Sequence, residues 1–201
     1  MRENDDGTFS FLTKASLYNY VLDITDTNNL QQYYDNGTDD QKFVLQLAAN
    51  TKIPERTYNI KSYLSGKYLD VENSATGDGT IIQQFPYNNT AAQDWLFIYI
   101  GNGNYKIQDV NSGKLLSIIG SSTSSGTDAW IWHDDGTSGQ IFRYRKNTDG
   151  TYSLLSKCSN YNYVLDIEMS PGSGMNDGND LQQYSDIDAA NQKFILDSMY
   201  Y

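Results

Sequence analysis

The sequence predicts an all-β protein built from one unit that occurs four times, about every 47 to 52 residues. Three observations support this fold class. The same anchor segments recur in the same order, apolar residues alternate with polar ones over short runs, and turn-forming residues separate these runs. No helical periodicity is sustained beyond one or two turns. Because a unit of this length cannot bury its apolar face alone, function has to be considered unit by unit.

Each repeat contains three anchors: an opening strand, a central apolar segment that usually carries an aspartate, and a closing segment of the form Gln-x-aromatic. The opening segments are residues 8–11, 57–60, 104–107 and 151–154. The central segments are residues 21–24, 68–71, 115–118 and 164–167. The closing segments are residues 41–43, 93–95, 140–142 and 192–194. We number the units from the first to the fourth repeat in chain order.

Strands are expected where apolar side chains alternate, as at Leu69 and Val71 or at Trp95 and Phe97. Turn signals separate these runs at residues 65–66, 78–79, 111–113 and 149–150. This pattern predicts about four short strands per repeat joined by hairpins, with helix limited to a turn such as residues 90–92. The aromatic residues expected to pack inside are Phe43, Trp95, Phe142, Phe194, Tyr58, Tyr105 and Tyr152.

The repeats divide unevenly along the chain. Residues 51–56 contain Pro54 and are predicted to be a linker, because the other junctions between repeats are tight. Residues 57–201 then form one complete domain of three repeats, and residues 1–50 are interpreted as the end of a preceding copy, cut off upstream. An orphan repeat leaves its core face exposed, so it should dock on the domain, associate between chains or be poorly ordered. The alternative division is repeats one to three plus an orphan fourth.

Composition limits the classes of partner. The 201 residues carry a formal net charge of -11 and only 19% are charged, which argues against nucleic acid and anionic membranes, since both attract Lys and Arg. No apolar run approaches the length of a membrane span. The abundant amides and hydroxyls, with 17 tyrosines, suit uncharged polar ligands. The lone Cys158 excludes an intrachain disulfide, and residues 1–6 do not resemble a signal peptide, so localisation must be inferred from the fold.

These anchors resemble the ricin B-chain-like lectin repeat, which also occurs in family 13 carbohydrate-binding modules. The best match is the second repeat, at residues 66–71, 79–85 and 93–95, and the resemblance covers nearly all of the chain outside the linker and termini. It implies a β-trefoil, a six-stranded barrel capped by three hairpins with pseudo-threefold symmetry. Members bind galactosides, xylan, arabinan or other glycans, often beside a glycoside hydrolase or toxin, so a secreted bacterial protein is implied.

A shallow sugar site needs a flat ring for the C–H face of a pyranose and fixed polar groups for its hydroxyls. The fourth repeat has the full set that the resemblance implies. Asp166 is expected to accept two adjacent hydroxyls, and Tyr184 to stack on the ring. Asn191, backed by Gln192, is expected to donate to a hydroxyl. Gln182 should line the floor, because it shares a strand face with Tyr184.

The fourth repeat departs from the family pattern only at Ile187, which stands where a polar contact sometimes lies.

The other repeats keep only parts of this set. The first repeat has Asp23, Gln31, Tyr33, Asn36, Asp40 and Gln41. There Asp40 replaces the amide, which removes a donor and adds repulsion, so binding should be weaker or altered. The second repeat has Asp70, Gln83, Phe85 and Asn88. Ala92 at its amide position predicts weak binding or none.

The third repeat has lost the carboxylate to Ser117 and the amide to Gly139, while Trp130 replaces the floor glutamine and Trp132 is retained. It is expected to be structural unless Trp132 serves a different ligand.

A structural interpretation competes with each of these assignments. An aspartate at a strand end often caps its own turn. The closing glutamines persist even in the third repeat, which favours a structural role for all four of them.

Other functions find less support. No nucleophile, metalloprotease or phosphate-loop motif is present, and the lone His133 lacks a second ligand residue, so neither catalysis, a metal nor a cofactor is expected. Residues 176–180 are rich in oxygen ligands but lack the glutamate of a calcium loop. The hypothesis is therefore a non-catalytic carbohydrate-binding module that targets an attached enzyme or toxin to a saccharide. The alternative is a protein-interaction or inhibitor-type β-trefoil.

Overall fold

The computed structural model describes residues 2–3, 9–10, 20–24, 30–36, 38–41, 52–169 and 175–198. The chain divides into two compact units, residues 1–51 and residues 52–201. Among the described residues, no helix is long and apolar enough to span a bilayer.

The first unit contains two small antiparallel pairs. Strand β1 (Arg2–Glu3) pairs with β2 (Phe9–Ser10), and β3 (Tyr20–Ile24) pairs with β4 (Leu30–Tyr34). A 3₁₀ turn, η2 (Asp39–Gln41), follows. The β3–β4 register places Asp23 opposite Gln31, as the repeat pattern requires. The packing of this unit on a domain or on another chain stays a prediction.

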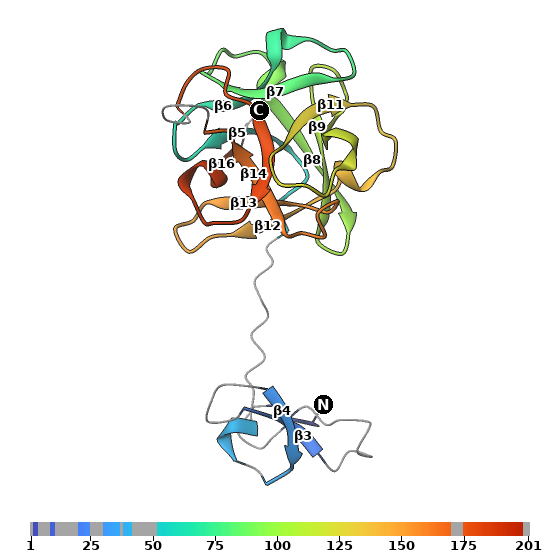
Figure 1. Cartoon of the computed structure of the whole chain (residues 1–201), viewed down its shortest axis with the longest axis vertical. Helices are drawn as coiled ribbons and strands as arrows, with labels where there is room; N and C mark the ends of the chain where they lie inside the picture. Colours follow the sequence, from blue (N-terminus) through green and yellow to red (C-terminus); the bar gives the residue numbers. More distant parts are fainter. Residues whose placement is uncertain are drawn as a thin grey trace. The chain divides into compact units, whose positions relative to one another are not determined.

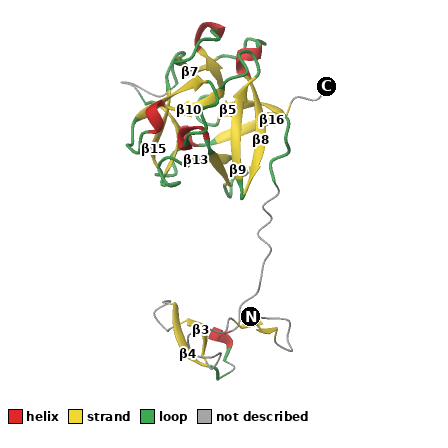
Figure 2. Ribbon diagram, turned by 90° about the vertical axis from the view of Figure 1, so that its right-hand side faces the viewer, coloured by secondary structure: helices red, strands yellow, loops and turns green. Residues whose placement is uncertain are grey.

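The second unit contains one twelve-stranded sheet (Figure 1). Its strands are β5 (Thr57–Ser62), β6 (Tyr68–Val71), β7 (Thr80–Phe85), β8 (Asp94–Gly101), β9 (Asn104–Asp109), β10 (Leu115–Ile118), β11 (Thr127–Trp132), β12 (Phe142–Lys146), β13 (Tyr152–Ser156), β14 (Tyr163–Ile167), β15 (Leu181–Ser185) and β16 (Phe194–Ser198). Its helical parts are short 3₁₀ turns: η3 (Glu72–Ser74), η4 (Ala91–Gln93), η5 (Ile119–Ser121), η6 (Ser138–Gln140) and η7 (Ala190–Gln192) (Figure 2).

Six of these strands close into a barrel. Strand β5 pairs with β8, β8 with β9, β9 with β12, β12 with β13, β13 with β16, and β16 returns to β5. The other six form the hairpins β6–β7, β10–β11 and β14–β15. Strand β11 pairs with both β7 and β15, and a bridge between Gln83 and Asp180 joins the remaining hairpins. This is the barrel-and-hairpin arrangement that the sequence resemblance implies, and closure leaves the barrel without free edges.

The core lies inside the barrel and under the hairpins. The closing aromatic residues Trp95, Phe142 and Phe194 are completely buried, as expected from their positions in the repeats. The indole Nε1 of Trp95 donates to the Leu69 carbonyl oxygen at 3.1 Å, which fixes the β6–β7 hairpin against the barrel. Tyr58 is also buried, as predicted. Phe43 lies outside the described residues.

Residues 52–56, within the predicted linker, pack on the barrel. Ile53 is buried in the core, and its carbonyl oxygen accepts from the Tyr105 hydroxyl at 3.4 Å. The Pro54 carbonyl oxygen accepts from the Tyr58 hydroxyl at 3.2 Å. These residues therefore belong to the second unit, although no apolar periodicity in so short a segment indicates it.

Candidate functional site

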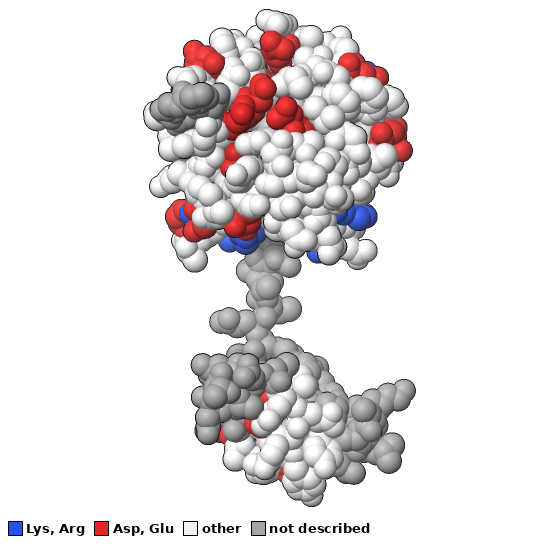
Figure 3. Space-filling view, in the orientation of Figure 1, with Lys and Arg blue, Asp and Glu red and all other residues white. Residues whose placement is uncertain are grey.

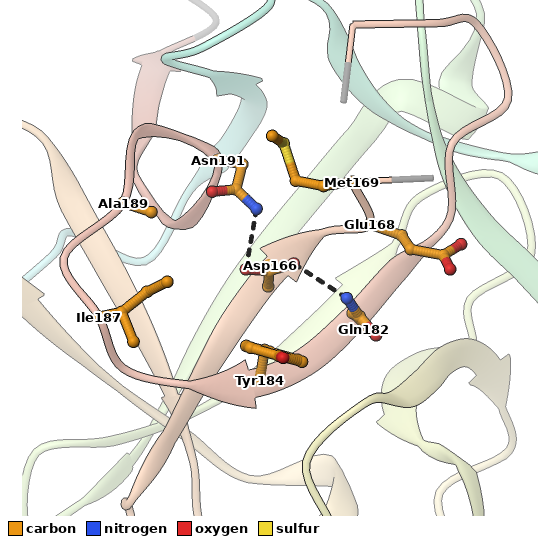
Figure 4. A pocket seen from close by; sticks show the side chains of 8 residues that line it. All are labelled: Asp166, Glu168, Met169, Gln182, Tyr184, Ile187, Ala189 and Asn191. Carbon is orange, nitrogen blue, oxygen red and sulfur yellow. Dashed lines mark hydrogen bonds between the residues drawn. The ribbon is translucent and has the colours of Figure 1, made fainter. Parts of the chain in front are cut away.

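The fourth repeat brings its predicted polar residues together around one carboxylate. The β14–β15 register places Asp166 directly opposite Gln182, and only 3% of Asp166 is exposed. Gln182 Nε2 donates to Asp166 Oδ1 at 3.0 Å. Asn191 Nδ2 donates to Asp166 Oδ2 at 2.9 Å (Figure 4). Gln192 Nε2 donates to the same oxygen at 3.0 Å. Three amide groups therefore hold the carboxylate in one orientation.

Burial and hydrogen bonding act on this carboxylate in opposite directions. Desolvation is the larger effect and raises the pKa of Asp166 above its ordinary value of 3.8, and the nearby negative charge of Glu168 raises it further. The three amide donors lower this pKa, because they stabilise the ionised form. The poorly solvated position of this carboxylate disfavours its ionised form in the folded chain, and such perturbed carboxylates are common at functional sites.

Asp166 lies in an open hollow of about 440 Å³ (Figure 4). The residues that line it are Asp166, Glu168, Met169, Gln182, Tyr184, Ile187, Ala189 and Asn191. Tyr184 is 41% exposed and forms one wall, two residues after Gln182 on the same face of β15. The hollow therefore combines a flat ring with a fixed carboxylate, which are the elements predicted for a sugar site.

Asn191 differs in detail from its predicted role. Its Nδ2 donates to Asp166 Oδ2 and also to the Ile167 carbonyl oxygen, both at 2.9 Å. An amide nitrogen has two hydrogens, so both donors are used within the protein. If the amide were flipped, its Oδ1 would face Asp166 Oδ2 and the Ile167 carbonyl oxygen, which are both acceptors. Asn191 therefore offers its Oδ1 acceptor to a ligand, whereas the sequence interpretation expected it to donate.

Gln192 lies behind the hollow and is buried. Besides Asp166, its Nε2 donates to the Ser185 carbonyl oxygen at 2.8 Å, and its Oε1 accepts from the Ile187 backbone N–H at 3.0 Å. It thus holds the loop between β15 and η7 and does not line the site. Equivalent bonds fix the corresponding loops of the other repeats through Gln41, Gln93 and Gln140. The predicted site residues Gln41 and Gln192 are therefore positioning residues.

The sequence interpretation missed Glu168, Met169 and Ala189, which also line the hollow. Glu168 follows Asp166 by two residues, so strand alternation continued past the end of β14 could have identified it. Met169 follows it directly, and Ala189 lies in the loop before η7. No periodicity indicates either of these two positions.

Comparison with family models matches residues 1–85, 39–102 and 91–184 to the ricin-type beta-trefoil lectin domain-like family. The chain belongs to this family. Among solved structures, the designed threefold-symmetric protein ThreeFoil is 33% identical, with 71% of this chain and 99% of that chain covered at a TM-score of 0.67.

Two more distant structures support the fold. An exo-beta-1,3-galactanase from Clostridium thermocellum is 23% identical over 90% of this chain at a TM-score of 0.67, and the match covers only 38% of the galactanase chain. The Macrolepiota procera ricin B-like lectin, solved in complex with lactose, is 20% identical over 77% of this chain and 100% of that chain, at a TM-score of 0.61. Comparison with curated proteins gives no match.

The second repeat of this lectin-like chain rebuilds the same constellation with a different amide. Asp70 is buried, burial raises its pKa, and Gln83 Nε2 donates to its Oδ1 at 3.1 Å. Ala92 is buried and offers no amide, as predicted. Asn88 Nδ2 takes its place and donates to Asp70 Oδ2 at 3.2 Å. With Phe85 36% exposed, this repeat retains a carboxylate, an amide and a ring.

The third repeat of the family pattern has a different surface. Trp130 and Trp132 stack with ring centroids 4.6 Å apart and flank a hollow of about 290 Å³ that Ser117 also lines. A Cβ atom at Gly139 would lie 2.7 Å from Ser121 Oγ and 2.9 Å from the carbonyl oxygen of Ile118. An amide side chain at this position would therefore force its neighbours to shift, and with Ser117 and Gly139 the repeat lacks the carboxylate–amide pair.

The first repeat keeps its carboxylate and ring. Asp23 is buried and accepts from Gln31 Nε2 at 2.7 Å through Oδ2, while Tyr33 is 51% exposed. Among the described residues, Asp23 Oδ1 has no hydrogen-bond partner, in contrast to the doubly bonded Oδ2 of Asp166. Asn36 Oδ1 accepts from the backbone N–H and the hydroxyl of Thr38. Within the described part of the chain, Asn36 makes no hydrogen bond to Asp23. The side chain of Asp40 lies outside the described residues, so its predicted repulsion stays a prediction.

Proposed function

We propose that this chain binds neutral saccharides without catalysing a reaction, and that the hollow around Asp166 is its principal site. One observation carries the proposal: a buried carboxylate, oriented by three amide groups, lies at the floor of an open hollow with an exposed tyrosine ring as its wall. A pyranose offers the matching surfaces, hydroxyl donors on its edge and C–H groups on its face.

The hydrogen-bond inventory defines the expected contacts. A carboxylate has about four lone-pair sites, and the amides of Gln182, Asn191 and Gln192 occupy three of those on Asp166. One strong acceptor site therefore remains for a sugar hydroxyl, whereas the sequence interpretation expected Asp166 to accept two. A second, adjacent hydroxyl can donate to Asn191 Oδ1, since both hydrogens of that amide are used elsewhere. The ligand is thus a sugar that presents two neighbouring hydroxyl donors and a flat C–H face for Tyr184.

The affinity of one such hollow should be modest. A hydrogen bond to a charged group contributes about 1.5–3 kcal/mol and a neutral one about 0.5–1.5 kcal/mol. An aromatic contact adds about 0.5–1.5 kcal/mol beyond buried area. Their sum is near the roughly 4 kcal/mol of a millimolar complex. Useful affinity for a polymer then requires several hollows to bind together, with the second repeat as the next contributor.

The setting of the module is also a proposal. A weak, open site without catalytic groups suits a module of the family 13 carbohydrate-binding type, which holds an attached glycoside hydrolase or toxin on its substrate. The likeness to part of a galactanase supports this setting, which we place in a secreted bacterial protein. The net charge of -11, with acidic side chains spread over the face seen in Figure 3, favours a neutral polysaccharide over an anionic one. Self-association through the extra repeat in residues 1–50 would add avidity.

A glycan array and a plant-polysaccharide pull-down with the full chain test the proposal. We expect binding to neutral galactose-, xylose- or arabinose-containing glycans, and loss of most of it in Tyr184→Ala. Tyr63→Ala is the matched control, because Tyr63 is also an exposed tyrosine and does not line the Asp166 hollow. Absence of glycan binding in a folded chain would favour the protein-interaction alternative.

A further inference from the structure

A second hollow adjoins the Asp166 site. It has a volume of about 440 Å³ and lies between the β12–β13 loop, the loop from β15 to η7, and the start of β16. Ile187 lines both hollows, so they share a wall. Apart from Ile187, none of the sugar-site positions of the repeat pattern lies in this second space, which we call the lateral hollow.

The shared wall is apolar and firmly placed. Ile187 is 67% exposed, so its side chain is available to a ligand from either hollow. Its backbone N–H donates to Gln192 Oε1, on the same glutamine that donates to Asp166. One buried side chain therefore fixes the ridge relative to the carboxylate. A ridge of this kind suits the C–H groups around a glycosidic bond.

Apart from Lys146, the charged side chains that line the lateral hollow form ion pairs. The guanidinium of Arg145 makes two bonds to Asp186, from Nη1 to Oδ2 at 2.5 Å and from Nη2 to Oδ1 at 3.3 Å. Lys193 Nζ lies 2.9 Å from Asp188 Oδ1 and 3.3 Å from Asp149 Oδ2. These pairs hold the polar atoms in place, so little side-chain entropy is lost when a ligand binds. An anionic ligand would have to compete with the carboxylates, whereas hydroxyls can use the remaining donor and acceptor sites.

We infer that the ligand is a neutral oligosaccharide that extends from the Asp166 hollow across Ile187 into the lateral hollow. The terminal residue occupies the first space and the adjacent residue the second, where exposed Lys146 and Thr148 line the outer wall. This inference rests on the proposed function, because both concern the saccharide bound at Asp166. It adds that the ligand must have at least two sugar residues to fill both hollows. It also assigns a role to Ile187, the one position at which the fourth repeat departs from the family pattern.

Calorimetric titration of the full chain tests the inference with two series of probes. One is methyl β-galactoside and lactose, and the other is methyl β-xyloside, xylobiose and xylotriose. We expect a disaccharide to bind about 3- to 10-fold more tightly than its monosaccharide, the gain from one or two solvent-exposed hydrogen bonds. The double variant Lys146→Ala/Thr148→Ala should reduce that ratio toward one. Lys157→Ala removes an exposed lysine that does not line the lateral hollow and should leave the ratio unchanged.

The outcomes separate the two proposals. Equal affinity for monosaccharide and disaccharide overturns the inference and leaves the proposed function intact. A gain that survives the double variant also overturns it, because the second residue then lies elsewhere. If neither series binds and the glycan array is also negative, the proposed function itself fails.

Discussion

Replacing Asp166 by asparagine should separate its role in binding from its role in folding. The introduced carbonyl oxygen can take the place of Oδ2 and keep the bonds from Asn191 and Gln192. The introduced NH₂ then faces Gln182 Nε2, formerly a donor to Oδ1 at 3.0 Å. Gln182 can turn its amide and accept instead. The change also removes a buried charge, so the free energy of unfolding should change by less than about 1 kcal/mol.

Binding responds differently to the same substitution. The sugar hydroxyl loses a charge-assisted bond, and the position it used now carries a donor. The hydroxyl can then only accept from this NH₂, and exchanging a charge-assisted bond for a neutral one costs about 1–2 kcal/mol, which weakens binding about 5- to 30-fold. By contrast, Asp166→Ala leaves three buried amide groups without their acceptor and should lower the free energy of unfolding by on the order of 3 kcal/mol, even with some water entry.

Urea denaturation and calorimetry with lactose or xylotriose measure both effects. Asp197→Asn is the control, because it removes an exposed carboxylate away from the hollow. If Asp166→Asn binds like the unaltered chain, the carboxylate is not the sugar acceptor. If Asp166→Asn is destabilised as much as Asp166→Ala, Gln182 does not reorient and the account of the network is wrong.

Three further results are expected. Burial raises the pKa of Asp166 above 3.8, so saccharide affinity should fall on acidification with a midpoint above pH 3.8. Between pH 3.8 and this raised pKa, the folded chain binds more protons than the unfolded chain, so its free energy of unfolding should fall as the pH rises. A binding midpoint at or below pH 3.8 would contradict this. Gly139→Asn should destabilise the chain by about 1–3 kcal/mol in urea denaturation, because its Cβ meets Ser121 Oγ at 2.7 Å, and unchanged stability would refute the close packing. Ligand binding should leave tryptophan emission unchanged, since Trp130 and Trp132 flank the third-repeat hollow and not the Asp166 site, whereas a shift in emission would locate the ligand in the third repeat.

The barrel and the grouping of the fourth-repeat residues were expected from the resemblance that the four repeats carry, and period-two alternation accounts for part of that grouping. Once Asp166 is placed on a strand, the register brings Gln182 opposite it and puts Tyr184 on the same face. The same reasoning gives the buried aromatic residue that closes each repeat of the second unit.

Details set by loops could not be predicted in this way. The loop between β15 and η7 decides that Asn191 uses both of its hydrogens within the protein and presents an acceptor. In the second repeat, the loop lets Asn88 reach Asp70 from four residues before the expected position at Ala92. The lateral hollow depends on the end of β12 and the loop after it meeting the loop between β15 and η7 and Lys193, which precedes β16. Such meetings between distant segments leave no local pattern in the sequence.

The central claim is that a saccharide binds at Asp166 between Tyr184 and Asn191. A ¹⁵N-resolved NMR titration with lactose and xylotriose tests it most directly, because the side-chain amides of Gln182 and Asn191 give signals of their own. The account predicts saturable shifts that are largest for these two amides and for the backbone N–H of Ile187. Shifts confined to other parts of the chain, or none in a folded sample at millimolar sugar, would contradict it.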